Sequence, residues 1–177
     1  MAKRAFHISF GNSADHSLDY LLGMLEDVRV TTWLTVQNLQ VEELDWQYKA
    51  GWNTIGALLS HITALEHYFR IEFVEGRKLT EAENQQWEPA LDMGKYIPQL
   101  IAGHPISTYQ ASLAASRQLL VQSLKNLTFE DFTKRIEGYD ADSGCNLAWV
   151  LFHMIEDEIY HRGQISMIRK LYKEHYG

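Results

Sequence analysis

A segment that begins near Ser143 to Asn146 and runs toward Lys173 repeats inward-facing side chains at the three- and four-residue steps of a helix. The inward set is Val150, His153, Met154, Asp157, His161, Ile165, Ile168 and Leu171. His153, Asp157 and His161 follow one another four residues apart, which places them on one helical face, one turn above the next. A long helix that turns two imidazoles and a carboxylate toward a core either builds a site or buries polar groups at a cost.

Two earlier segments show the same apolar spacing. The first runs from about Asp15 to Asn38, and Asp15 or Ser13 can cap its start. The second follows Asn53, a plausible N-cap, and ends at Gly76. Each carries a continuous apolar stripe, so we predict that both are helices that pack against the C-terminal one.

A third such segment opens at Pro105 and Ser107, after a long connection over residues 81–103. That connection holds prolines and glycines, which disfavour a continuous helix, and we expect one short helical turn around Gly94 to Leu100. The other connection covers residues 128–144. We therefore predict an all-α, four-helix bundle in one domain, residues 1–177, with a long crossover between helices 2 and 3.

Charge and composition narrow the classes of function. The formal net charge is −7 and the pI is near 5.6, which argues against nucleic acid as the main partner, because phosphate neutralisation dominates such binding. The single cysteine, Cys145, excludes an intrachain disulfide. No stretch approaches the roughly 20 apolar residues that span a bilayer, and the N-terminus lacks the apolar core of a signal peptide. We expect no membrane association and a cytoplasmic location.

Helix geometry divides the stripe of polar groups. Residues eight apart lie about 12 Å apart along a helix axis, so His153 and His161 do not share one ion. Residues four apart lie about 6 Å apart along the axis, which two side chains can bridge. The pair that binds one ion is therefore either His153 with Asp157 or Asp157 with His161. Glu158 and His161 offer a third pairing, but a di-iron site needs that Glu-x-x-His spacing on two helices.

A metal site also needs a ligand from another helix. His61 is the best candidate, because it lies in the apolar register of the second predicted helix with Leu58 and Leu65. Glu66 lies nearer the margin of that face and is a candidate to support the ligands from behind. A buried carboxylate at Asp157 needs a partner, and spacing alone supports a metal and a plain hydrogen-bonded network equally.

Several motifs resemble those of the DinB/YfiT-like superfamily of small four-helix-bundle proteins. The strongest match is Leu151-Phe152-His153 followed by Tyr160-His161-Arg162-Gly163-Gln164-Ile165. The second is the run from Trp52 to Ile62, with Glu66. The segments Arg29 to Trp33 and Glu43 to Trp46 add weaker support. The resemblance extends over about Asp15 to Leu171.

The resemblance implies a divalent metal, often zinc or nickel, held by three histidines: one on the second helix and two, four apart, on the last. The matching positions are His61, Asp157 and His161, so this chain has a carboxylate where the family usually has histidine. Two histidines and one carboxylate are a known open-site ligand set. His153, Glu66 and Arg162 are expected around the ligands rather than on the metal.

Two functions remain open at this point. Characterised relatives resemble thiol-dependent S-transferases and isomerases that use mycothiol, bacillithiol or glutathione, or metal-dependent hydrolases. By this resemblance the chain is a metal-dependent enzyme acting on a small molecule, with a low-molecular-weight thiol as a second cofactor, and it forms a homodimer. The alternative is a non-catalytic homodimeric stress-response or interaction protein, in which the polar cluster is structural.

Overall fold

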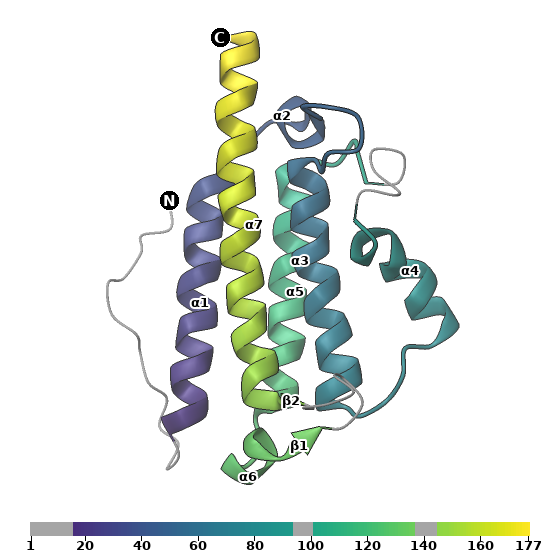
Figure 1. The fold of residues 1–177 in the computed structure, drawn as a ribbon, viewed down its shortest axis with the longest axis vertical. Coiled ribbons are helices and arrows are strands. Elements are labelled where there is room, and N and C mark those ends of the chain that lie inside the picture. The colour runs from purple at the N-terminus through teal and green to yellow at the C-terminus, as the bar shows by residue number, and fades with distance from the viewer. Residues whose placement is uncertain (1–15, 94–100, 137–144) are drawn as a thin grey trace.

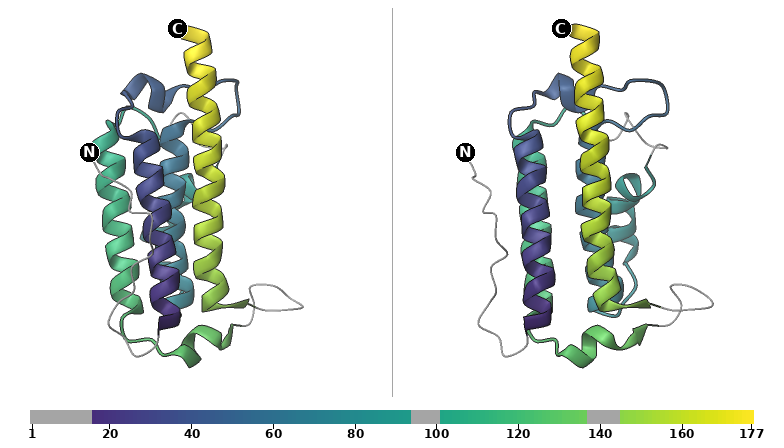
Figure 2. Two further views of the ribbon diagram at one scale, coloured as in Figure 1. Left: turned by 90° about the vertical axis from the view of Figure 1, so that its left-hand side faces the viewer. Right: turned by 60° about the vertical axis from the view of Figure 1, so that its left-hand side comes forward.

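A computed structural model describes residues 16–93, 101–136 and 145–177 and shows four long helices side by side (Figure 1). These are α1 (His16–Val36), α3 (Ile55–Phe69), α5 (Ile106–Leu124) and α7 (Leu147–Tyr176). Helix α7 packs against α1 and α3, and α3 also packs against α5. In Figure 2, α7 runs past the ends of the other three helices. The predicted all-α fold is confirmed.

Short elements fill the connections. They are α2 (Val41–Asp45), a π-helical turn η1 (Arg70–Val74), α4 (Glu81–Leu91), α6 (Phe129–Thr133), β1 (Arg135–Ile136) and β2 (Cys145–Asn146). The two strands pair antiparallel, with Arg135 opposite Asn146 and Ile136 opposite Cys145. None of the helices in the described ranges combines the length and the apolar character that a membrane span requires.

The connection between α3 and α5 is more helical than we predicted. Helix α4 occupies residues that we expected to be irregular because they contain Pro89. Thr80 caps this helix and forms a capping box with Glu83, which satisfies the first free N–H groups. Pro89 lies in the last turn, so its missing N–H removes a single bond shortly before the helix ends. The turn expected around Gly94 to Leu100 lies outside the described residues.

The ends of the long helices lie close to their predicted positions. Thr54, rather than Asn53, caps α3 and accepts a hydrogen bond from the backbone N–H of Ala57 at 3.1 Å. Asn146 caps α7 and accepts from the backbone N–H of Trp149 at 2.9 Å. The α-helical part of the second segment ends at Phe69, and η1 continues it. The proposed caps Ser13 and Asp15 fall outside the described residues.

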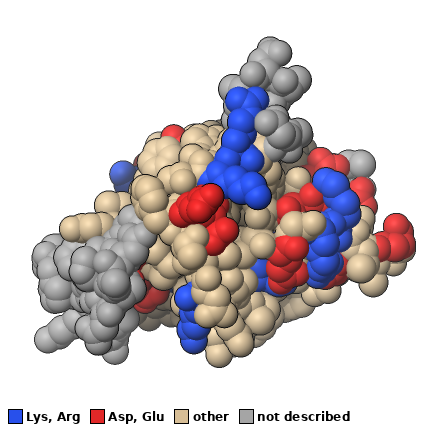
Figure 3. Space-filling model, turned by 90° about the horizontal axis from the view of Figure 1, so that it is seen from below, with Lys and Arg blue, Asp and Glu red and all other residues tan. Residues whose placement is uncertain are grey.

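Acidic and basic side chains both reach the surface at the end of the bundle that carries α6. Figure 3 views this end, and it shows blue and red residues next to each other rather than a field of one sign. A nucleic-acid-binding face would concentrate lysine and arginine. The described part of this face therefore lacks that electrostatic pattern.

Candidate metal centre

A layer of polar side chains crosses the bundle between two apolar clusters. One cluster contains Leu58, Leu113 and Ile165, and the other contains Leu25, Phe69, Leu120 and Leu151. All four long helices contribute buried polar residues between these clusters. They are Arg29 and Thr32 from α1, His61 and Glu66 from α3, Ser116 and Arg117 from α5, and Glu158 and His161 from α7.

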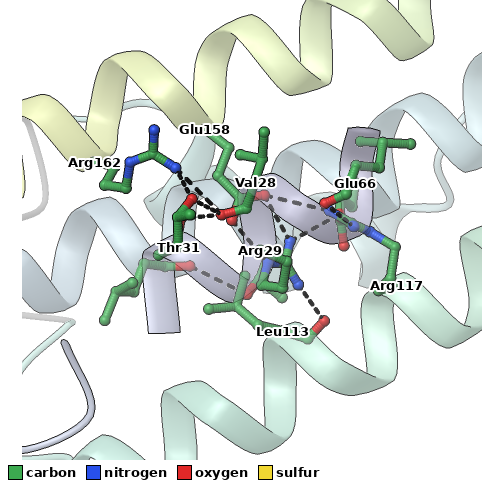
Figure 4. Close-up of polar contacts among 12 residues, drawn as sticks. Val28, Arg29, Thr31, Glu66, Leu113, Arg117, Glu158 and Arg162 are labelled. Atoms are coloured by element: carbon green, nitrogen blue, oxygen red, sulfur yellow. Dashed lines mark hydrogen bonds and ion pairs between the residues drawn. The ribbon is translucent and has the colours of Figure 1, made fainter. Parts of the chain in front are cut away.

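Two arginines and two glutamates in this layer neutralise one another (Figure 4). Arg29 donates to Glu158 at 2.9 Å and to Glu66 at 2.9 Å. Arg117 donates to the same two carboxylates, at 2.7 Å to Glu66 and 3.3 Å to Glu158. Buried charges are tolerated only when they are paired in this way. The four residues tie all four long helices together.

The remaining donors of the two arginines also have acceptors. Arg29 Nη1 donates to the Leu113 carbonyl at 2.7 Å, and Arg117 Nη1 donates to the Leu25 carbonyl at 2.7 Å. Ser116 donates to the second oxygen of Glu66. Because its charges and hydrogen bonds are satisfied internally, this arginine–glutamate network serves the fold rather than chemistry on a ligand.

Beside the network, His61 from α3 meets Asp157 and His161 from α7. Asp157 Oδ1 lies 3.2 Å from His161 Nε2, and Asp157 Oδ2 lies 3.9 Å from His61 Nε2. The two imidazole rings are 4.9 Å apart and nearly perpendicular. Each residue offers one ligand atom, and these atoms all lie within 4.8 Å of one another. The structure thus brings the three proposed metal ligands together.

The far nitrogen of each ring is held by an oxygen. His61 Nδ1 lies 2.9 Å from the carbonyl oxygen of Ala90, near the end of α4. His161 Nδ1 lies 3.0 Å from Gln164 Oε1. Because both oxygens are acceptors, each Nδ1 carries a hydrogen, and a neutral ring then keeps its lone pair on Nε2, the nitrogen that faces Asp157. Such a partner behind a histidine ligand fixes the tautomer and the ring orientation.

The two histidines have different electrostatic environments. Burial lowers the pKa of His61 below the usual imidazole value, so the ring is neutral near pH 7. Burial also acts to lower the pKa of His161, but the hydrogen bond and the negative charge of Asp157 outweigh it and raise that pKa. A lone pair and a carboxylate 3.2 Å apart repel each other unless a cation lies between them. The cluster therefore requires either a proton on His161 or a bound cation.

The donor set fits a divalent transition metal. Ligands about 2.1 Å from a tetrahedral zinc are about 3.4 Å from one another. The separation of Asp157 Oδ1 from His161 Nε2 is 3.2 Å, and that of Asp157 Oδ2 from His61 Nε2 is 3.9 Å. These two distances join different oxygens of Asp157, and one ligand atom from each residue lies within 4.8 Å of the others, so the side chains would move closer together to hold one ion. Two imidazoles and one carboxylate leave a fourth position open.

The residues expected around the ligands have other contacts. Glu66 belongs to the arginine–glutamate network. Arg162 donates to the Val28 carbonyl and to Thr31 Oγ1, so it joins α7 to α1 (Figure 4). His153 stacks on Trp149, with ring centroids 5.0 Å apart.

The groups behind the two histidines escaped the sequence analysis. The Ala90 carbonyl lies in a segment that we predicted to be irregular, and it reaches His61 only through the packing of α4 on α3. Gln164 carried a usable signal, because it lies three residues after His161 on the same helix.

A hollow lies next to Gln164, between α7 and the loop before α3. Its lining is Gly51, Trp52, Asn53, Gln164, Met167 and Ile168. Trp52 and Met167 are 46% and 55% exposed, so the hollow presents apolar side chains to the surface. The buried Oδ1 of Asn53 has no hydrogen-bond partner among the described residues. The hollow therefore offers apolar contact to a small molecule.

Comparison with known families agrees with the all-α fold. A protein-family model described as the DinB superfamily matches residues 24–165, which include His61, Asp157 and His161. No match was found among the curated proteins.

Proposed function

The chain belongs to the DinB superfamily, and we propose that it is a metal-dependent enzyme whose site is formed by His61, Asp157 and His161. The observation that carries the proposal is the convergence of three lone-pair donors from two helices, with the far nitrogens of both histidines held by oxygen acceptors. The proposed reaction is transfer of a low-molecular-weight thiol to a small molecule, or hydrolysis of one.

Zinc or nickel matches this ligand set, because imidazole suits both ions and a carboxylate also binds them. A bound ion with three protein ligands would lower the pKa of water or of a thiol at its open position and so supply a nucleophile near neutral pH. His61 and His161 would each give Nε2, and Asp157 would give one carboxylate oxygen. The carboxylate would also offset part of the charge of the ion.

Other residues of the chain have roles that follow from their positions. The Ala90 carbonyl and Gln164 hold the two imidazoles in the tautomer that leaves Nε2 free. The hollow beside Gln164 supplies a place for the small molecule, with Trp52 and Met167 as apolar contacts.

Elemental analysis tests this proposal directly. The protein is purified without chelator and compared with the His61→Ala/His161→Ala double variant. We expect one zinc or nickel ion per chain in the wild type and none in the variant. Equal metal content in the two proteins, including none in both, would refute the metal site.

A second candidate function follows from the pair formed by Asp157 and His161. Their 3.2 Å contact is also that of a hydrogen bond to a protonated imidazole, which needs no metal. The cluster would then be structural and the protein non-catalytic. Thermal unfolding separates the two, because a bound metal stabilises the folded state by linkage. A melting temperature that falls with EDTA supports the metal, and one that EDTA leaves unchanged supports the structural cluster.

A further inference from the structure

We propose that a cavity between α3, α4 and α5 binds a neutral nucleoside, and that its occupancy is coupled to the metal centre through Ala90. The cavity has a volume of about 410 Å³, within the range of roughly 300–1,000 Å³ that is usual for small-molecule sites. It is separate from the hollow beside Gln164, because the two share no lining residue. Figure 1 shows α4 beside α3, on the side away from α1.

Three aromatic rings line this cavity: Trp87 of α4, Tyr109 of α5 and His104 from the loop before α5. Trp87 stacks on His67 with ring centroids 4.2 Å apart, and His104 meets Tyr109 edge to face at 6.0 Å. Tyr109 is buried, and its hydroxyl lies so close to Gly56 that a Cβ atom there would collide with it. These contacts hold the rings in place before a ligand binds. Such a wall suits a nucleobase, because every base has a flat face that stacks on aromatic side chains.

The polar groups of the wall match the edge of a base and the hydroxyls of a ribose. Gln85 and Gln86 of α4 carry amides, and a glutamine amide can pair with adenine by donating one hydrogen bond and accepting another. Ser60 of α3 and Thr108 and Ser112 of α5 carry hydroxyls, which both donate and accept. Because these side chains come from three helices, a ligand would be held from more than one side.

The charge of the lining favours a nucleoside over a nucleotide. Its described residues include no aspartate, glutamate, lysine or arginine, although these types make up 22% of the chain. Burial, together with the negative charge of Asp45, raises the pKa of Tyr109 to about 12, so the phenol is also neutral near pH 7. A phosphate group that leaves water needs cationic partners, and this wall supplies neither lysine nor arginine.

Ala90 connects the cavity to the metal centre. It lines the cavity, and its carbonyl oxygen lies 2.9 Å from His61 Nδ1. A ligand that packs against Ala90 would restrain the end of α4 and so hold the acceptor that orients His61. Coupling of this kind is reciprocal, so zinc and the nucleoside should tighten the binding of each other by the same factor. The coupling rests on the proposed metal centre, whereas the binding of the nucleoside does not.

Isothermal titration calorimetry in EDTA tests the cavity without any metal. Adenosine should bind the wild type with a submillimolar Kd, and AMP and ribose should each bind at least about tenfold more weakly. AMP adds only the phosphate charge, and ribose lacks the base. Because this comparison uses the wild type alone, it does not depend on the folding of any variant. An adenosine affinity no higher than that of AMP or ribose, or no binding of adenosine, would overturn the nucleoside site.

Two tryptophan variants locate the binding. Ser112 is exposed and lines the cavity, so Ser112→Trp should fill it and weaken adenosine binding at least about tenfold. Ala114 is also exposed on α5 but lies about 200° further round the helix, so Ala114→Trp should bind adenosine within about twofold of the wild type. Circular dichroism should give both variants the wild-type melting transition. Undiminished binding by a folded Ser112→Trp variant would also overturn this site.

Competition against a chromogenic chelator, with and without saturating adenosine, tests the coupling. Adenosine should raise the zinc affinity of the wild type about fivefold or more, and it should have no such effect on Ser112→Trp. An unchanged zinc affinity with adenosine bound would overturn the coupling. A wild type that binds adenosine in EDTA but takes up no zinc would refute the metal centre, and the coupling with it, while it supports the nucleoside site.

Discussion

Gln164 Oε1 lies 3.0 Å from Nδ1 of His161, three residues earlier on the same helix. This contact places a hydrogen on Nδ1, so in the neutral ring the lone pair of Nε2 faces Asp157. It therefore connects a residue outside the ligand set to the state of a proposed ligand. Two substitutions at this position separate hydrogen-bond acceptance from packing.

Gln164→Leu should weaken zinc binding by about 10- to 100-fold, the range seen when a partner behind a histidine ligand is lost. Leucine keeps much of the glutamine volume but accepts no hydrogen bond. Gln164→Glu keeps an acceptor and should bind zinc within a few-fold of the wild type. Competition against a chromogenic chelator measures both affinities. Equal affinity in all three proteins would mean that the contact does not orient a ligand.

Asp157 distinguishes a metal site from a metal-free pair. Asp157→Asn removes the charge with little change in shape and should abolish stoichiometric zinc, because an amide oxygen is a much weaker ligand than a carboxylate. Asp157→His restores a third imidazole and should retain one ion per chain. Metal content after dialysis checks both. Retention of zinc by the asparagine variant would remove Asp157 from the ligand set.

The arginine–glutamate network should dominate the effect of mutation on stability. Arg29→Met leaves Glu66 and Glu158 with Arg117 as their only described cationic partner, so we expect a loss of about 3–5 kcal/mol in the free energy of unfolding. Arg29→Lys keeps the charge but not the fork of donors, and it should lose less. Urea unfolding, followed by circular dichroism, measures both. A loss under about 1 kcal/mol for Arg29→Met would contradict this role.

Apolar periodicity predicted the long helices well because each buries a continuous stripe. It missed α4, which is short and polar and carries Pro89. The sequence did contain a start signal for α4, the capping pair of Thr80 and Glu83, but that signal is local and weak without an apolar stripe behind it.

The positions of His61, Asp157 and His161 along their helices also predicted the candidate site, since all three fall on the inward faces of predicted helices. The partners of Glu158 were not predicted, although Glu158 shares the inward face of α7 with Met154 and Ile165. Charged residues are normally assigned to the surface. A charged residue on the inward face of a helix can be predicted to be buried only when an opposite charge lies at the same height on a neighbouring helix, as Arg29 does for Glu158. A single sequence does not show which residues of two helices lie at the same height.

Acid should unfold the protein partly through Glu66. Burial acts to raise the pKa of this carboxyl group, but the charges of Arg29 and Arg117 and the hydrogen bond from Ser116 outweigh it and hold the pKa below the usual 4.5. Glu158, the other carboxylate of the network, pairs with the same two arginines. Between the folded and the unfolded pKa the unfolded chain binds more protons, so the free energy of unfolding rises with pH there.

The contribution of Glu66 is therefore complete above about pH 5 and is lost as the pH falls through the folded pKa. Urea unfolding at a series of pH values from neutral to acid should show this loss in the wild type. Glu66→Gln removes the titrating group, so that variant should be less stable at neutral pH and should lose less stability on acidification. Parallel pH curves for the two proteins would show that Glu66 keeps its usual pKa in the folded state.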